Sequence, residues 1–235
     1  MKKLFIIFSL FTSMVLHAQV GTYSDYLRPV KQELAKQFPE NKTINIVFHG
    51  HSVPSGYFKT PAVNTLESYP HLTLLAVKKH YPYAVVNTLT TSIGGENAEQ
   101  GALRFENEVL NHLPDVIFID YALNDRGIGL ERAKKAWISM IEKATTKGIK
   151  IVLMTPTPDL GEDIRDSNAP LELHSKQIRE LAKKYKTGLI DSYKAFKNKK
   201  LNGEDLNSYM SQGNHPNGEG HKIVKELIME YFIDR

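Results

Sequence analysis

Short apolar segments alternate along the chain with longer segments in which apolar residues recur every three or four positions. The apolar segments predict five β-strands, at Ile44–His49, Ala84–Leu89, Val116–Tyr121, Ile151–Met154 and Gly188–Ile190. Residues 116–119 are apolar at every position, which is typical of a parallel strand covered on both faces.

Helical segments lie between and after these strands. Apolar residues spaced by three and four mark one helix face in 130–144, 178–185 and 223–232, and another face begins at Ala98. Tyr26–Phe38 also has a helical pattern. Because strands alternate with helices, the sequence predicts right-handed βαβ units and a parallel sheet between two layers of helices. Ligands of such α/β folds bind outside the carboxyl ends of the strands, near the point where the strand order reverses.

The start of the chain differs from the rest and is typical of an export signal. Two lysines precede an apolar run of 13 residues, Leu4–Leu16, and the small residue Ala18 offers a cleavage site. The run is shorter than the ~20 residues that cross a bilayer. We predict a signal peptide at 1–18, a periplasmic or secreted protein without a stable membrane anchor, and a single domain over 19–235 whose helical N-terminal segment spans about 22–40.

Composition excludes several classes of protein and site. Hydrophobic residues make up 41% and charged residues 24% of the chain, which is ordinary for a globular domain. A formal charge of +4 is too small to indicate a nucleic-acid partner. The chain has no cysteine, so disulfides, cysteine nucleophiles, thiolate metal sites and a lipid on a cysteine at the cleavage site are all excluded.

Four polar motifs lie where predicted strands end or where the last helix begins. Ser52 follows the first strand in a glycine-rich turn, which can present a nucleophilic hydroxyl to a cleft. Gly95 and Asn124 follow the second and third strands and can donate hydrogen bonds to a developing oxyanion. His215 precedes a proline at the entrance of the last helix, which suits a general base. Each motif taken alone is also typical of an ordinary turn or helix cap.

Together the motifs resemble, in the same order, the four sequence blocks of the SGNH, or GDSL-like, hydrolases: Gly50-His51-Ser52, Gly95, Asn124-Asp125 and His215-Pro216. The resemblance spans 45–235. It implies a three-layer α/β/α sandwich with a five-stranded parallel sheet, the flavodoxin-like SGNH hydrolase fold. It also implies hydrolysis of an ester through an acyl-enzyme intermediate, with no cofactor and no metal.

The resemblance also assigns roles by position. Ser52 would be the nucleophile and His215 the base that takes its proton and returns it to the leaving alcohol. The amides of Ser52 and Gly95 and the side chain of Asn124 would form the oxyanion hole.

Two positions depart from the family pattern. The family's aspartate before the serine is His51 here, and we expect it to replace a structural hydrogen-bonding group, because neighbouring residues of an extended strand point to opposite faces. The triad aspartate, three residues before the histidine, is Gln212. A glutamine can accept the imidazole N–H but carries no negative charge, so we predict a dyad with a neutral or backbone group orienting the histidine.

Two alternative functions remain open at this level. His49 and His51, two positions apart, are predicted to share a strand face and could bind zinc with Asp120 or Asp125, giving a metal-dependent hydrolase. A catalytically weakened carbohydrate-binding descendant of the fold is the other alternative.

The leading prediction is an exported serine ester hydrolase that removes acetyl or other short acyl groups from a carbohydrate. Its partner would be a small-molecule or polysaccharide ester. The loops 53–62 and 155–169 follow strands or the serine turn and are predicted to select the substrate.

Overall fold

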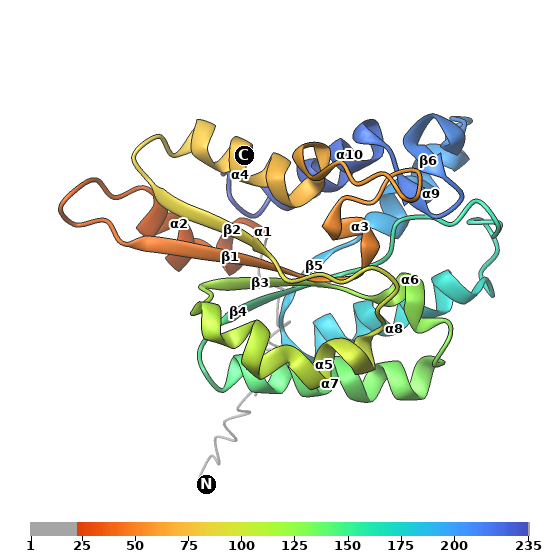
Figure 1. The fold of residues 1–235 in the computed structure, drawn as a ribbon, viewed down its shortest axis with the longest axis horizontal. Helices are drawn as coiled ribbons and strands as arrows, with labels where there is room; N and C mark the ends of the chain where they lie inside the picture. Colours follow the sequence, from red (N-terminus) through yellow and green to blue (C-terminus); the bar gives the residue numbers. More distant parts are fainter. Residues whose placement is uncertain (1–22, 235) are drawn as a thin grey trace, which may run out of the picture.

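Five parallel strands form one sheet between two layers of helices in the computed structural model, which describes residues 23–234 (Figure 1). The strands are β1 (Thr43–Gly50), β2 (Val85–Thr90), β3 (Val116–Asp120), β4 (Lys150–Met154) and β5 (Gly188–Ile190). Each agrees with its apolar segment to within one residue at either end. The predicted three-layer α/β/α fold is therefore confirmed.

The sheet order β2-β1-β3-β4-β5 explains where a site can form. The chain leaves β1 in one direction to build β2, then crosses back over β1 to build β3. The strand order therefore reverses between β1 and β3, whose carboxyl ends lie side by side with Gly50 opposite Asp120. This is the position at which flavodoxin-like sheets bind their ligands.

Helices cover both faces of the sheet (Figure 1). One layer contains α2 (Arg28–Leu34), α4 (Tyr69–His80), α9 (Ser192–Leu201) and α10 (Gly218–Met229), and the other contains α5 (Ala98–Glu108), α7 (Leu130–Thr145) and α8 (Pro170–Tyr185). Shorter elements are α1 (Tyr23–Tyr26), α3 (Ser52–Ser55), α6 (Ala122–Asp125), the 3-10 turns Thr65–Glu67, Leu110–His112 and Leu206–Tyr209, and the hairpin β6 (Met210–Gln212) and β7 (His215–Pro216).

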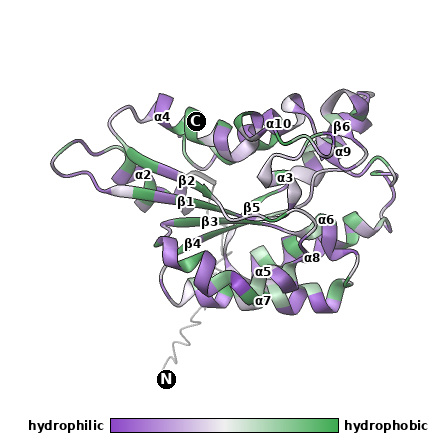
Figure 2. Cartoon of the chain, in the orientation of Figure 1, coloured by the Kyte–Doolittle hydropathy of each residue, from purple (hydrophilic) through white to green (hydrophobic). Residues whose placement is uncertain are grey.

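Side chains of the central strands alternate between two hydrophobic cores. Phe48 and Phe118 stack with ring centroids 4.9 Å apart in the core beneath α4 and α10. Ile117 and Ile119 point the other way, toward α5 and α7. Because both of their faces are buried, β3 and β4 are apolar along most of their length, while the outer helix faces carry polar residues (Figure 2).

The structure adds helices that the apolar spacing does not indicate. The buried residues of α4 include a proline and a threonine, and α9 buries only Tyr193 and Phe196 as large apolar side chains, so neither has a broad apolar stripe. The N-terminal helical segment ends at Leu34, earlier than predicted. The predicted signal peptide lies outside the described residues. Within 23–234 no helix is both long and apolar enough to cross a membrane.

Candidate active site

Ser52 lies immediately beyond the carboxyl end of β1. The strand ends at Gly50 and the chain turns at once into the short helix α3, whose first residue is Ser52. A side chain at position 50 would lie 2.4 Å from the carbonyl oxygen of Asp120, so only glycine fits this turn. The Ser52 Oγ lies 2.8 Å from Nε2 of His215, within hydrogen-bonding distance across 163 residues of sequence.

A small hairpin positions His215. Strands β6 and β7 pair antiparallel, with Gln212 opposite His215 and a tight connection through Gly213 and Asn214. The Ser211 hydroxyl donates to the His215 carbonyl at 3.1 Å and ties the two strands together. The imidazole is therefore held by its backbone on a rigid turn just before α10.

Nδ1 of His215, the ring nitrogen that does not face Ser52, contacts two groups that favour opposite tautomers. Its Nδ1 lies 3.0 Å from the main-chain carbonyl of Phe58, which requires a proton on Nδ1. The amide nitrogen of Gln212 lies 2.7 Å from the same Nδ1, and an N–H donor there favours the unprotonated atom. The Gln212 oxygen faces away and accepts from the Thr60 amide at 3.0 Å. In the tautomer that carries its proton on Nδ1, the Phe58 carbonyl accepts a hydrogen bond from that nitrogen and Nε2 is free to accept the Ser52 proton.

Burial sets the charge of the imidazole. His215 is 5% exposed, and this burial lowers its pKa below the ordinary value of 6.5, with the Phe58 carbonyl opposing the shift. The ring is therefore neutral at neutral pH. A neutral ring with a free Nε2 lone pair is the form required of a general base.

The turn after β2 lies beside this pair. It contains Gly94 and Gly95, the latter with φ +80°, and it ends at Asn97, which caps α5 as a capping box with Gln100. The Ile93 amide donates to the Gly50 carbonyl at 3.0 Å, which joins the turn to the end of β1.

Asn124 joins the same turn from the end of β3. Its Nδ2 donates to the Glu96 carbonyl at 2.9 Å. Hydrogen bonds therefore join the turn that contains Gly95 both to the end of β1, two residues before Ser52, and to Asn124 after β3.

A buried polar network supports the turn from behind. Glu96 is 6% exposed and accepts hydrogen bonds from Arg104 Nε and from the Tyr121 hydroxyl, each at 2.7 Å. The same hydroxyl lies 3.1 Å from Nε2 of His49. Sequence reasoning did not find this network, because a glutamate after a glycine pair gives no local sign that it will be buried.

Comparison with known proteins identifies the family. The profile of the GDSL-like Lipase/Acylhydrolase family matches residues 48–223, which cover most of the described fold and all four motifs. The chain belongs to this family. It is accordingly a carboxylic ester hydrolase, as the motifs predicted.

Two solved structures of similar fold are described as esterases. The acetylxylan esterase Axe2 from Geobacillus stearothermophilus superposes with a TM-score of 0.71 at 18% identity, over 81% of this chain and 95% of that one. A two-domain esterase described as active on acetylated mannans gives a TM-score of 0.73 at 18% identity, over 91% of this chain and 54% of that one.

A sequence relative covers a smaller part of the chain. The uncharacterized lipoprotein YqeF of Bacillus subtilis (strain 168) is 33% identical over 81 residues, which are 31% of this chain. The match spans one third of the length of that relative.

The first departure from the GDSL-like pattern, His51, has a structural role. Its Nδ1 accepts the Val53 amide at 3.2 Å and caps α3, as a side-chain oxygen commonly caps a helix. Its Nε2 lies 3.3 Å from Oδ1 of Asp120, whose other oxygen accepts from the Tyr69 hydroxyl at 3.0 Å. The imidazole and the carboxylate are both buried and lie beneath the serine turn. His51 thus acts as the expected hydrogen-bonding replacement.

The prediction that His49 and His51 share a face is wrong. His49 turns toward α5, where its ring nitrogens lie 2.9 Å from the Thr91 hydroxyl and 3.2 Å from the Gly101 carbonyl. His51 turns instead toward Asp120, which faces α4, because β1 has already ended and the backbone is turning into α3. Burial lowers the pKa of His49 to about 3.

The other zinc ligands considered are engaged as well. Asp125 accepts from the Ala98 amide and from Trp137 Nε1, each at 2.7 Å. Within residues 23–234 no three histidine or carboxylate side chains converge as a metal site would require. The geometry of these residues therefore does not support the zinc alternative.

The loop 155–169 is fixed beside the histidine hairpin. The Leu160 amide donates to the Gly213 carbonyl at 2.7 Å, and Arg126 pairs with Asp159 at 2.8 Å. Arg126 also pairs with Glu162. These contacts hold the loop between the residues after Asn124 and the turn before His215, where it can form one wall of the site.

Proposed function

We propose that the protein is an exported serine esterase that removes acetyl or other short acyl groups from a carbohydrate through an acyl-enzyme. The observation that carries the proposal is the 2.8 Å contact between Ser52 Oγ and His215 Nε2, with Nδ1 held by the Phe58 carbonyl. This pair lies at the carboxyl ends of β1 and β3, between which the strand order reverses.

The first half of the reaction forms the acyl-enzyme. His215 takes the Ser52 proton as Oγ attacks the ester carbonyl carbon, and the carbonyl oxygen becomes an oxyanion. The amides of Ser52 and Gly95 and the Asn124 side chain donate to it. The intermediate collapses, the alcohol leaves, and His215 returns the proton to the alcohol oxygen. Water, deprotonated by the same ring, then attacks the acyl carbon, releases the acid and restores the serine.

The Phe58 carbonyl takes the place of the third triad member in this proposal. It fixes the productive tautomer, and its dipole partly stabilises the imidazolium that forms during catalysis. It carries no full charge, so the serine is less strongly activated than in an enzyme with a carboxylate at this position.

The proposed substrate class rests on two supports. Neighbours in fold are described as esterases of acetylated xylan and mannan. The predicted export signal would bring the enzyme to polysaccharides outside the cytoplasm.

The pH dependence should show the low pKa of the base. Protonated His215 cannot accept the serine proton, so kcat/KM falls as the pH drops through the His215 pKa. Because burial lowers that pKa, we expect the midpoint of the acid limb below pH 6.5. A pH profile with a small acetyl ester measures it. A midpoint clearly above pH 6.5 would contradict the conclusion that burial lowers the pKa of His215.

Replacing Gln212 with glutamate should strengthen the base. A carboxylate at this position can accept from both Nδ1 and the Thr60 amide, and it removes the N–H that now faces Nδ1. We expect the acid-limb midpoint to rise by about one pH unit and kcat to increase above that midpoint. Gln32→Glu, at an exposed position of α2, is the control. An unchanged profile in Gln212→Glu would show that position 212 does not affect the base.

Removing the Asn124 side chain should slow turnover. One oxyanion donor is typically worth ~3–4 kcal/mol of transition-state stabilisation, so we expect kcat for Asn124→Ala to fall about a hundredfold or more. The exposed Asn202, at the end of α9, provides the control Asn202→Ala. Thermal unfolding of both variants separates a loss of the donor from a loss of the fold. Near-normal kcat in folded Asn124→Ala would remove this residue from the oxyanion hole.

The function itself is tested with a panel of acetylated glycans and small synthetic esters. We expect acetate release from both, and covalent labelling by a serine-directed phosphonate at Ser52, located by mass spectrometry. A folded protein that hydrolyses no ester and takes up no phosphonate would refute the esterase proposal and favour a binding protein. Hydrolysis of small esters without any glycan ester would refute the substrate class only.

A further inference from the structure

A groove lies at the β2 edge of the sheet, between the end of that strand with the residues that follow it and the second half of α5. Its volume is about 410 Å3, and its lining includes Thr90, Ser92, Ile93, Arg104, Asn107 and His112. This volume falls within the roughly 300–1,000 Å3 typical of ligand sites. The groove is wide and open, as a site for part of a long ligand would be.

The groove begins at the candidate active site. Ile93 bonds to the Gly50 carbonyl at the end of β1 and is followed directly by Gly94 and Gly95. From there the lining passes Thr90, at the end of β2, and the second half of α5 to His112, whose carbonyl accepts from the Asn45 side chain in β1. A chain-like substrate with its ester at Ser52 could therefore continue past Ile93 into the groove.

Hydrogen-bonding groups in the groove are available to a ligand. Among the described residues, the side chains of Thr90, Asn107 and His112 are exposed and make no hydrogen bond to the protein. A hydroxyl, an amide and an imidazole can both donate and accept, which suits the hydroxyl groups of sugars. Ile93, 48% exposed, adds an apolar surface for the C–H face of a sugar ring.

The charges of the groove favour a neutral ligand. Arg104 pairs with Glu96 at the base of the groove and with Glu108 at 3.0 Å, so its positive charge is compensated within the protein. An anionic polymer would gain little electrostatic attraction there, whereas the binding of an uncharged glycan does not depend on a free positive charge.

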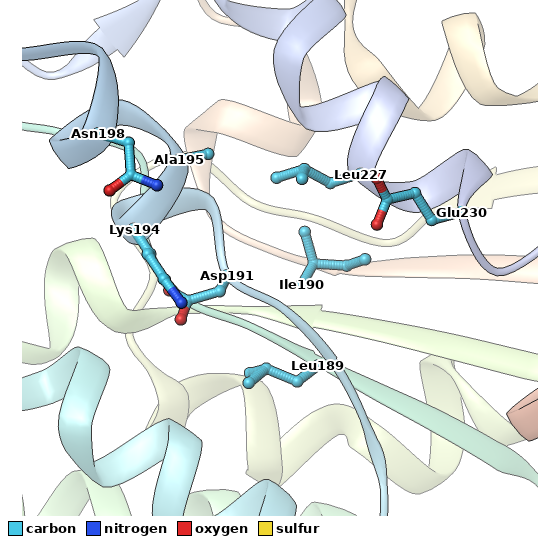
Figure 3. Close-up of a pocket in the computed structure, with 8 residues that line it drawn as sticks. All are labelled: Leu189, Ile190, Asp191, Lys194, Ala195, Asn198, Leu227 and Glu230. Atoms are coloured by element: carbon cyan, nitrogen blue, oxygen red, sulfur yellow. The ribbon is translucent and has the colours of Figure 1, made fainter. Parts of the chain in front are cut away.

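We propose that this groove binds further sugar units of a glycan chain whose acetyl ester is cleaved at Ser52. The inference rests on the proposed function and adds to it that the substrate is an oligo- or polysaccharide, held at more than one sugar. Another cavity, about 160 Å3, lies at the opposite edge of the sheet beside β5, lined by Lys194, Asn198 and Leu227 among others (Figure 3). It is smaller and remote from Ser52, which makes it a useful control region.

The test compares substrates of different length in a groove variant. For Asn107→Ala/His112→Ala we expect kcat/KM on long acetylated oligosaccharides to fall about tenfold, as the loss of two neutral hydrogen bonds predicts. The fall should appear in KM, with kcat unchanged. Rates on nitrophenyl acetate, which does not reach the groove, should match those of the unmodified enzyme. Asn198→Ala, in the cavity beside β5, should leave both substrates unaffected.

The results that would refute the groove differ from the result that would refute the esterase activity. An equal fall of kcat/KM on long and short substrates in the groove variant, or no fall on either, would refute the proposal that the groove binds the glycan. Equal kcat/KM of the unmodified enzyme on single acetylated sugars and on long oligosaccharides would overturn it too, while leaving the esterase intact. No turnover of any ester, nitrophenyl acetate included, would refute the proposed function itself.

Discussion

Ser52→Ala is expected to lower kcat on small acetyl esters by at least about a thousandfold, because no other nucleophile replaces the hydroxyl beside His215. The imidazole then has no serine proton to accept, and only a water molecule in the space left by Oγ can attack the ester. Any remaining activity would come from the oxyanion donors and from substrate binding. Steady-state kinetics with nitrophenyl acetate, together with the loss of phosphonate labelling, measures the effect.

A serine in the same short helix provides the matched control. Ser55, at the end of α3, donates to the His51 carbonyl at 2.9 Å and is not among the proposed catalytic groups. Ser55→Ala should therefore keep kcat and lose at most a little stability. If Ser52→Ala hydrolysed activated acetyl esters as fast as the unmodified protein, the serine mechanism would be rejected.

His51→Asp, which introduces the family's usual residue, should reduce the free energy of unfolding by about 3–5 kcal/mol. The new carboxylate would lie next to Asp120, where the imidazole now sits 3.3 Å from Oδ1. Both positions are buried, so the two acids would face each other without solvent. Urea denaturation measures the loss.

A second substitution tests whether the pair is the cause. Asp120→Asn in the His51→Asp background removes one acid and supplies an amide N–H that can donate to the other, while its oxygen can still accept from Tyr69. We expect the double variant to recover most of the lost stability. If the effects of the two substitutions were simply additive, the two side chains would not be coupled.

These expectations give the two departures from the family pattern different meanings. The His51 imidazole caps α3 and lies 3.3 Å from the carboxylate of Asp120, so a buried acid stands beneath the serine turn although position 51 itself holds none. Within residues 23–234 no acid contacts Nδ1 of His215 in place of Gln212, and the Phe58 main-chain carbonyl lies against this nitrogen instead. We therefore expect the first departure to affect mainly stability and the second mainly the pH profile.

The spacing of apolar and polar residues along the chain was enough to predict the sheet and the order of the motifs. Strands such as Val116–Asp120 are apolar at nearly every position because both faces are buried, and that pattern is readable without any tertiary information. The sharp turn from β1 into α3 requires glycine at position 50, and it places Ser52 at the start of the helix. The identities of Ser52, Gly95, Asn124 and His215 as candidates came from their place at strand ends and from the family motifs.

The contacts of the histidines, in contrast, become visible only in the folded chain. His49 and His51 differ because the strand ends between them, and Phe58 reaches Nδ1 of His215 through its carbonyl, which every residue type possesses. The orientation of the Gln212 amide depends on Thr60, which is 152 residues away. Contacts of this kind join backbone atoms and distant segments, and no spacing of residue types along the chain encodes them, because folding alone brings the partners together.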